Sequence, residues 1–361
     1  MSKSSIHQLP RVFGLDLLRS VAIILVTIVH SATLITDYFS EFPFITLPDG
    51  VDLFFVLSGF LIGSILIQTI HQYHVLHWEV LIQFLKRRWL RTLPNYFLFL
   101  GINVLLISFG LINGGINKYL ITYFVFFQNF YVPFDFLFWE SWSLSVEEWF
   151  YVLFPLLVFF VFRFKPSKFG NKTILISTIL CFLIVPFLIR WMMSYEIQSE
   201  AQRELYIRKL VITRLDCIAF GLFGAFIKKY YSEVWNKTRS TFFIAGLVLM
   251  ILLCNNFFGF SQLFLNVFYF SLIGVSALFL LPLLDNLNST NELLKPIEIL
   301  SKISYSMYLI QIPLFQLFIR FIPVNSCGSS IVRYSIYWLC LILLSAINYR
   351  YFEKYFLKLR D

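Results

Sequence analysis

The chain has 361 residues, of which 59% are hydrophobic and 14% are charged, against about 25% charged residues in soluble proteins. Its 29 basic and 20 acidic side chains are too few to cover the surface of a soluble globule, and Phe alone occurs 44 times. This composition excludes a soluble enzyme, a disulfide-rich secreted scaffold and a disordered regulator. The net charge of +9 lies on no clustered soluble face, so we expect no nucleic-acid partner and predict that the chain lies in a lipid bilayer.

Apolar runs of about 20 residues are long enough to cross a bilayer as helices. We predict ten such spans, at 14–36, 50–70, 92–110, 145–162, 173–192, 211–227, 241–258, 264–284, 303–323 and 331–349. A further apolar run at 119–131 is too short to cross comfortably, and we expect it to be re-entrant or interfacial. The predicted fold class is therefore all-α, a polytopic membrane protein with about ten transmembrane helices. No repeat or linker divides the chain, so residues 1–361 are expected to form a single membrane domain with no additional soluble domain.

Lys and Arg residues concentrate in alternate connectors of this scheme, including 163–172 and 228–239. Because cytoplasmic connectors carry an excess of Lys and Arg, the pattern predicts a multi-pass protein of the cell membrane with cytoplasmic N- and C-termini. Treating 119–131 as a full span would move both of these basic clusters to the outer side. The charge distribution therefore favours the ten-span scheme.

The first predicted span contains three ionisable residues, Asp16, Arg19 and His30, in LDLLRSVAIILVTIVH. Eleven helical residues make about three full turns, so Arg19 and His30 share one helix face with a rise of about 16 Å between them. Arg19 is expected near the cytoplasmic surface and His30 in the outer half of the membrane. Two structural alternatives stay open here, a snorkelling Arg19 and a His30 that only bonds a neighbouring helix.

Three other spans begin at the outer side with ionisable residues, and these are Asp52, Glu147, Glu148, Arg214 and Asp216. Each has a structural explanation, such as an acid in the first turn of a helix or a belt of interfacial tryptophans. Ionisable residues inside spans are nevertheless costly and are usually retained for a pathway or a reaction. Four spans that bring such groups to one depth therefore indicate a site.

The inner side carries a basic segment, FLKRRWLRTLP, with Arg87, Arg88 and Arg91, and a C-terminal segment, NYRYFEKYF, with Glu353. Positive-inside anchoring accounts for most such clusters. A site for a phosphorylated cytosolic ligand would require the same residues, because guanidinium groups bind phosphates bidentately. Both interpretations remain open at this level.

Taken together, these segments resemble the acyltransferase-3 family of integral membrane O-acyltransferases. The resemblance rests on LDLLRSVAIILVTIVH, GVDLFFVLSGFLI, FLKRRWLRTLP, WSLSVEEWFYVLFP, TRLDCIAFGLFGAF, ISYSMYLIQIPLF and NYRYFEKYF, in this order along nearly the whole chain. It implies transfer of an acyl group, commonly acetyl from acetyl-CoA or another acyl-CoA, to a hydroxyl of a carbohydrate. Lipopolysaccharide, exopolysaccharide and capsule all fit as acceptors. The oligomeric state stays open, and a homo-oligomer is compatible with the sequence.

The resemblance also implies roles for individual residues. His30 matches the essential histidine, acting as a general base or as a transient acyl acceptor, and Glu147 is the acid expected to orient the imidazole. The donor-binding residues are expected to be Arg19, Arg87, Arg88 and Arg91, and the supporting residues Asp16, Asp52, Glu148, Arg214, Asp216, Tyr305 and Glu353. Arg19 would hold a CoA phosphate while the pantetheine arm reaches His30 through one shared cavity.

The chain departs from the family pattern at two positions. Gln311 stands where many members carry a second histidine, so no role of that residue is carried over. Tyr355 stands where many members have proline after the C-terminal acid, which is expected to affect only the end of the last helix.

One other function and one metal site are compatible with parts of the sequence. Embedded His, Asp, Glu and Arg would also serve a proton-coupled transporter or flippase of a glycan or small anion, although the halves of the chain do not match. His71, His74 and His77 are spaced as HxxHxxH, but steps of three drift around a helix and no acid or cysteine is adjacent. We therefore predict no metal site.

Overall fold

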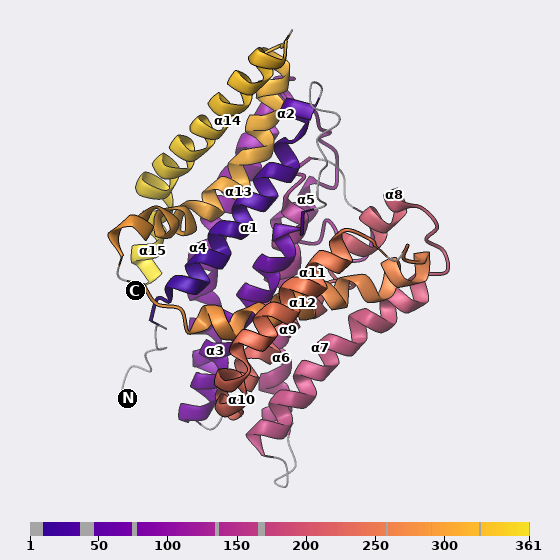
Figure 1. The fold of residues 1–361 in the computed structure, drawn as a ribbon, viewed down its shortest axis with the longest axis vertical. Helices are drawn as coiled ribbons and strands as arrows, with labels where there is room; N and C mark the ends of the chain where they lie inside the picture. The colour runs from indigo at the N-terminus through magenta and orange to yellow at the C-terminus, as the bar shows by residue number, and fades with distance from the viewer. Residues whose placement is uncertain are drawn as a thin grey trace.

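The computed structural model describes residues 10–36, 47–73, 78–133, 137–164, 170–257, 259–289, 291–324 and 326–360. Within these ranges the chain is helical and contains no β-strand, which confirms the all-α class (Figure 1). The longer helices are α1 (Phe13–Ser31), α3 (Gly50–Tyr73), α4 (Trp78–Ser108), α6 (Ser141–Phe164), α7 (Asn171–Met193), α9 (Leu215–Tyr230), α11 (Arg239–Cys254), α12 (Tyr269–Asp285), α13 (Lys295–Phe321) and α14 (Cys327–Asn348). The short ones are α2 (Thr33–Thr36), α5 (Leu120–Phe124), α8 (Glu200–Arg203), α10 (Ser232–Lys237), α15 (Lys354–Arg360), the π-helical turns η1 (Glu204–Arg208), η2 (Phe264–Phe268) and η4 (Tyr349–Glu353), and the 3-10 turn η3 (Glu292–Leu294).

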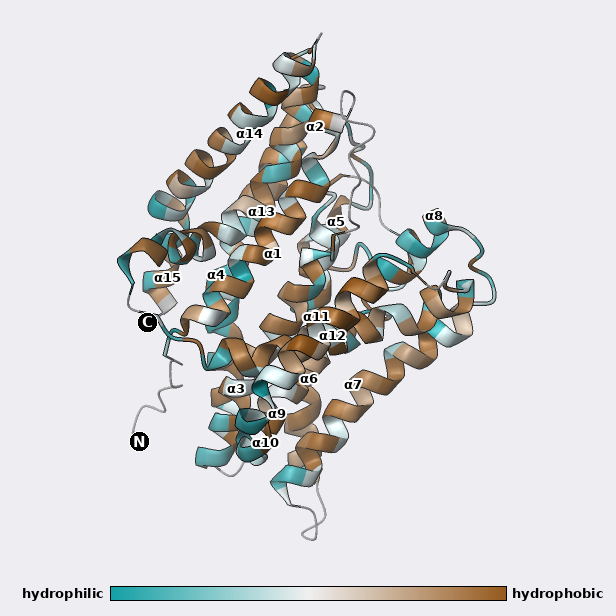
Figure 2. Cartoon of the chain, in the orientation of Figure 1, coloured by the Kyte–Doolittle hydropathy of each residue, from teal (hydrophilic) through white to brown (hydrophobic). Residues whose placement is uncertain are grey.

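Seven helical segments of the described chain are long and apolar enough to cross a membrane. Helices overlap all ten predicted spans, but the number ten is not confirmed. The helices α9 and α11 have 16 residues each, about 24 Å, which is shorter than the roughly 30 Å hydrocarbon core. The helix α13 has 27 residues but is not among the seven segments that are long and apolar enough to cross. Brown, hydrophobic ribbon dominates the long helices in Figure 2, while α8 and α10 are largely teal.

Several predicted boundaries differ from the structure, and the differences at α4 and α1 concern predicted donor-binding and catalytic residues. The third span was expected at 92–110, but α4 begins at Trp78, so the basic segment with Arg88 and Arg91 lies inside one continuous helix. The first span was expected to run to residue 36, but α1 ends at Ser31 and the separate turn α2 follows. Both basic residues are therefore held on a rigid element, which a connector would not provide.

The run at 119–131 does not form a spanning helix, in agreement with the sequence prediction. It consists of the five-residue helix α5 followed by irregular chain, and this chain is fixed by buried amides. Gln128 donates to Ser145 Oγ at 2.6 Å, and Asn129 donates to the backbone oxygens of Trp142 at 3.0 Å and Lys209 at 2.6 Å. Non-helical backbone inside a membrane protein requires such internal partners, because lipid offers none.

The core forms where α3 lies against α1, α9 and α12, with α13 packed on α1 and α14 lying along the outer side of α13 (Figure 1). Small residues allow the closest approaches. A Cβ on Gly221 of α9 would lie 1.8 Å from the backbone oxygen of Val56, and one on Gly59 of α3 would lie 1.8 Å from that of Ile218. Without a hydrophobic driving force between helices in lipid, such close contact is what holds α3 and α9 together.

We expect Gly221→Ala to lower the melting temperature of the detergent-purified protein by several degrees, because the added methyl must push backbone apart at a cost of about 1–3 kcal/mol. The matched control is Gly101→Ala in α4, where no atom lies within 4 Å of the new Cβ. That variant should be neutral or more stable by about 0.5–1 kcal/mol. Equal melting temperatures for the two variants would contradict the close α3–α9 contact.

Candidate active site

The helix α1 borders two cavities. The inner cavity, of about 90 Å³, is lined by Arg19, Val51, Phe54, Phe55, Ser58, Leu61, Arg88, Arg91, Thr92, Ser143, Leu144, Glu147, Ser304, Tyr305 and Tyr308. The outer cavity, of about 700 Å³, is lined by His30, Asn103, Asn113, Gly114, Gly115, Asn117, Leu137, Trp139, Ile312, Phe315 and Gln316. The sequence analysis expected one shared cavity, but Arg19 and His30 line two different ones. Both cavities are bordered by α1, α4, α13 and the segment around the start of α6.

Basic side chains dominate the inner cavity. The Arg88 guanidinium lies over the ring of Tyr151, with its central carbon 4.3 Å from the ring centroid, and its buried Nε has no hydrogen-bond partner. Arg19 has only a distant ion pair with Asp16, at 3.8 Å. Three guanidinium groups, those of Arg19, Arg88 and Arg91, thus face one small space. An anionic ligand with several phosphate oxygens would compensate this charge.

Glu147 lies in the wall of the inner cavity, together with Arg19. Its carboxylate accepts hydrogen bonds from Ser58 Oγ and from Tyr151 Oη, both at 2.9 Å. The sequence analysis expected Glu147 to orient His30, whereas the residues lining the His30 cavity do not include it. The two residues named as catalytic therefore lie on different cavities in this structure.

His30 opens onto the outer cavity from the end of α1. Its Nδ1 is buried and has no hydrogen-bond partner among the described residues, and the side chain of Gln311 is a close polar neighbour. The described residues that line this cavity carry amide groups, an indole and glycines, and none is charged apart from a protonated His30. Amides and an aromatic ring are suited to neutral hydroxyl-rich ligands, with the imidazole positioned to exchange a proton.

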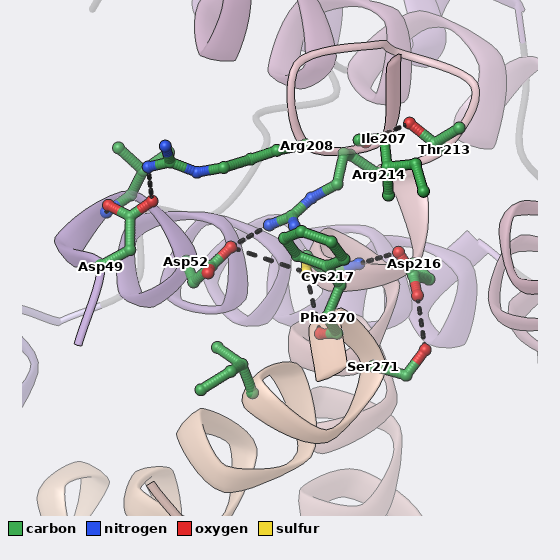
Figure 3. Close-up of polar contacts among 12 residues, drawn as sticks. Asp49, Asp52, Ile207, Arg208, Thr213, Arg214, Asp216, Cys217, Phe270 and Ser271 are labelled. Carbon is green, nitrogen blue, oxygen red and sulfur yellow. Dashed lines mark hydrogen bonds and ion pairs between the residues drawn. The ribbon is translucent and has the colours of Figure 1, made fainter. Parts of the chain in front are cut away.

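Buried ion pairs lie near the N-terminal ends of α3 and α9 (Figure 3), and Arg190 of α7 takes part in one of them. Asp52 pairs with Arg214, whose guanidinium lies 4.3 Å from the Phe270 ring centroid and whose Nε and Nη1 have no partner. Asp216 pairs bidentately with Arg190 at 2.7 and 3.0 Å. These acid–base pairs neutralise one another within the protein. The structure thus assigns Asp52, Arg214 and Asp216 to a buried framework beside the cavities.

The pair of Asp49 and Arg208 was missed in the sequence analysis. Asp49 caps the start of α3 by accepting from the Val51 amide at 2.9 Å, and its other oxygen pairs with Arg208. Burial alone would raise the pKa of the Asp49 carboxyl, but the neighbouring Arg208 guanidinium holds that pKa below its ordinary value. The sequence does contain a signal for Asp49, because an acid directly before the glycine that begins a helix is typical of an N-cap. Arg190 was also missed, although it lies near the end of the predicted span 173–192.

The other predicted supporting residues bind neighbouring helices. Asp16 pairs with Arg11 and accepts a hydrogen bond from Ser301 at 2.7 Å. Glu148 accepts from the Thr92 hydroxyl at 2.6 Å, and Tyr305 donates to the Thr92 backbone oxygen at 2.8 Å. Glu353 accepts from Asn95 at 3.1 Å and from Ser306 at 2.8 Å. Only Tyr305 of this group lines the inner cavity, and Arg87 does not line it. The described residues hold no cluster of three metal-ligating side chains, and His74 and His77 lie outside them.

Fold and site together define an integral membrane protein with a basic inner cavity and a histidine-lined outer one. Residues 12–350 match the family model described as an acyltransferase domain, so the chain belongs to the acyltransferase-3 family. It is 29% identical over 369 residues to the O-acetyltransferase OatA of Staphylococcus aureus strains NCTC 8325 / PS 47, COL and MRSA252. The alignment covers 94% of this chain and 56% of those proteins, so the chain spans little more than half their length. No solved structure matches.

We expect Asp52→Ala to destabilise the protein by about 3–5 kcal/mol, because it leaves the buried Arg214 guanidinium without a counter-charge. Thermal unfolding in detergent measures the effect. The control is Lys237→Ala, which removes an exposed pair with Glu233 at 3.6 Å and should change stability by less than about 1 kcal/mol. If Asp52→Ala has the same melting temperature as the Lys237→Ala control, the Asp52–Arg214 pair is not a framework element.

Glu140, directly before α6, is a buried acid that the sequence analysis did not single out. Neither of its carboxylate oxygens has a hydrogen-bond partner from another residue. Burial raises its pKa from the ordinary 4.5 to about 8. The proton therefore binds the folded state more tightly than the unfolded state, so Glu140 makes stability fall as pH rises from about 4.5 to about 8.

For this reason Glu140→Gln should melt higher than the wild type at pH 9, by roughly 5 °C, and equally at pH 5. Glutamine keeps the size of the side chain and mimics the protonated form. The measurement is the melting temperature in detergent across this pH range. Parallel pH curves for the two proteins would rule out Glu140 as the titrating group.

Proposed function

We propose that the protein is a membrane O-acyltransferase, which moves an acyl group, acetyl in the first instance, from acyl-CoA to a hydroxyl of a carbohydrate of the cell envelope. One observation carries the proposal. The helix α1 places Arg19 in the wall of the basic inner cavity and His30 in the wall of the large outer cavity. Membership of the acyltransferase family and similarity to proteins named O-acetyltransferase support the reaction type.

The inner cavity is the proposed donor site. CoA is a polyphosphate, and the guanidinium groups of Arg19, Arg88 and Arg91 provide the complementary charge. The cavity follows α3 from Leu61 to Val51, ten residues or about 15 Å, a length that suits an extended pantetheine arm. The thioester would then approach the level of His30 from the cytoplasmic side.

The outer cavity is the proposed acceptor site. Its volume of about 700 Å³ suits sugar rings, and its amide and indole side chains suit neutral hydroxyl groups. Lipopolysaccharide, exopolysaccharide and capsule are all acceptors of this chemistry. With Arg19 inside and His30 outside, the protein would be a multi-pass protein of the cell membrane with cytoplasmic termini.

The proposed reaction uses His30 as a general base. The imidazole takes the proton of the acceptor hydroxyl while that oxygen attacks the thioester carbon. The carbon–sulfur bond then breaks, the CoA thiolate leaves and takes up the proton that His30 accepted, and the ester remains on the sugar. A second route lets His30 attack first and hold the acyl group until the hydroxyl collects it. Either route requires a ring nitrogen that can take up a proton or an acyl group, and the position of His30 in the wall of the outer cavity supports this role.

His30→Ala should lower transfer of labelled acetyl from acetyl-CoA to glycan by about 10²–10⁴-fold while leaving donor binding intact, because only the proton acceptor is lost. Arg19→Ala should weaken acetyl-CoA binding by about tenfold or more. The assay uses purified protein in detergent, where no sealed compartment exists, so a covalent labelled product excludes a transporter. Arg239→Ala, an exposed basic residue, is the control for lost charge. Normal turnover by His30→Ala would reject the mechanism.

A further inference from the structure

A hydrogen-bonded contact between α13 and α6, called the partition below, lies in the wall of the inner cavity. Ser143 Oγ and Tyr308 Oη are 2.6 Å apart, and both hydroxyls also lie within hydrogen-bond distance of the Glu140 backbone oxygen, at 3.3 and 3.0 Å. Tyr308 and Ser143 are both buried. They line the inner cavity, whereas Ile312, one turn further along α13, lines the outer cavity. The partition therefore stands at the boundary between the two spaces.

The histidine lies just beyond this boundary. The Gln311 side chain, which neighbours the His30 ring, donates from its Nε2 to the backbone oxygen of Tyr308 at 3.2 Å. Tyr308 thus lines the inner cavity and, through its backbone oxygen, contacts the residue that neighbours His30.

The partition is built to open. The two hydrogen bonds of the Tyr308 hydroxyl join neutral groups, and such bonds contribute little net free energy. A rotation of the Tyr308 side chain can therefore break them within a catalytic cycle. The partners left behind are a serine hydroxyl and a backbone oxygen, which can bond to a passing pantetheine amide. By contrast, the nearby carboxylate–guanidinium pairs are buried and charged, and breaking them would be far more costly.

We propose, building on the function proposed above, that Tyr308 is a positioning residue that separates the donor cavity from the acceptor cavity and opens only for the acyl end of the donor. When the ring closes, water of the outer cavity cannot reach a waiting thioester. When it opens, the thioester carbon reaches His30 and the acceptor hydroxyl. Tyr308 thereby sets the ratio of acyl transfer to wasteful hydrolysis.

The chemical difference between the two outcomes lies only in the attacking oxygen. In transfer, the sugar oxygen forms the new carbon–oxygen bond as the carbon–sulfur bond breaks. In hydrolysis, the oxygen of water forms that bond as the carbon–sulfur bond breaks. One proton of water goes to the CoA thiolate, and the other leaves the new carboxyl group, so the products are acetate and CoA. Hydrolysis requires no acceptor, so it can be measured although the carbohydrate is unidentified.

The test measures acetate and CoA released from acetyl-CoA by the purified protein in detergent with no carbohydrate present. Tyr308→Ala, which removes the ring, should raise this hydrolysis by about tenfold. Tyr308→Phe, which keeps the ring and loses only the two hydrogen bonds, should raise it about threefold. If Tyr308→Ala does not fold, Tyr308→Phe decides the question.

Tyr337→Phe is the matched control. Tyr337 is buried, donates from its hydroxyl to the Gln311 backbone oxygen at 3.1 Å and lines neither cavity, so its loss should leave hydrolysis at the wild-type rate. If the wild type binds acetyl-CoA but both Tyr308 variants hydrolyse it at the wild-type rate, the partition is overturned and the proposed function stands. If the wild type does not bind acetyl-CoA at all, the proposed function fails, and this inference fails with it.

Discussion

A charge buried in an apolar slab must have a partner, and this constraint organises the interior of the protein. Lipid cannot solvate an ionised side chain, so an embedded acid or base is neutralised by a neighbour, held next to a cavity, or left uncharged. Asp216 with Arg190 and Asp52 with Arg214 follow the first rule. Arg88 and His30, each with an unpartnered nitrogen beside a cavity, follow the second. The first group forms the buried framework, and the second group lines the candidate site.

The helix α1 gives the site its length. A single rigid helix holds Arg19 and His30 on one face, so the distance between a donor's charged head and its reactive end is fixed by helix geometry and not by loops. The helix is held in turn by α13, where Ser20 donates to the Ile297 oxygen at 2.8 Å, and by α3, which approaches at Gly50. Sites built on such elements are more precise than sites built on connectors.

Much of this organisation was predictable from the sequence. Apolar run length identified the positions of the main helices, and motif order identified the family. The number of spans was not predictable, because α9 and α11 carry apolar sequence without the length to cross, and run length alone does not show where a helix ends. The position of Glu147 was also beyond reach, since helical spacing gives a direction around one axis but not which neighbouring helix it faces. The separation into two cavities depends on the Ser143–Tyr308 contact, which joins residues far apart in sequence.

The neutral lining of the outer cavity makes the two halves of the site respond differently to ionic strength. Counter-ions weaken the attraction between guanidinium groups and a polyanion, and this attraction is largely screened beyond a Debye length of about 8 Å at physiological salt. The described walls around His30 offer dipoles in place of fixed charges, and dipolar recognition is almost indifferent to such screening. Under the function proposed above, added salt would therefore weaken binding of the polyanionic donor and leave binding of an uncharged acceptor unchanged. The affinities for the two proposed substrates would then respond separately to ionic strength.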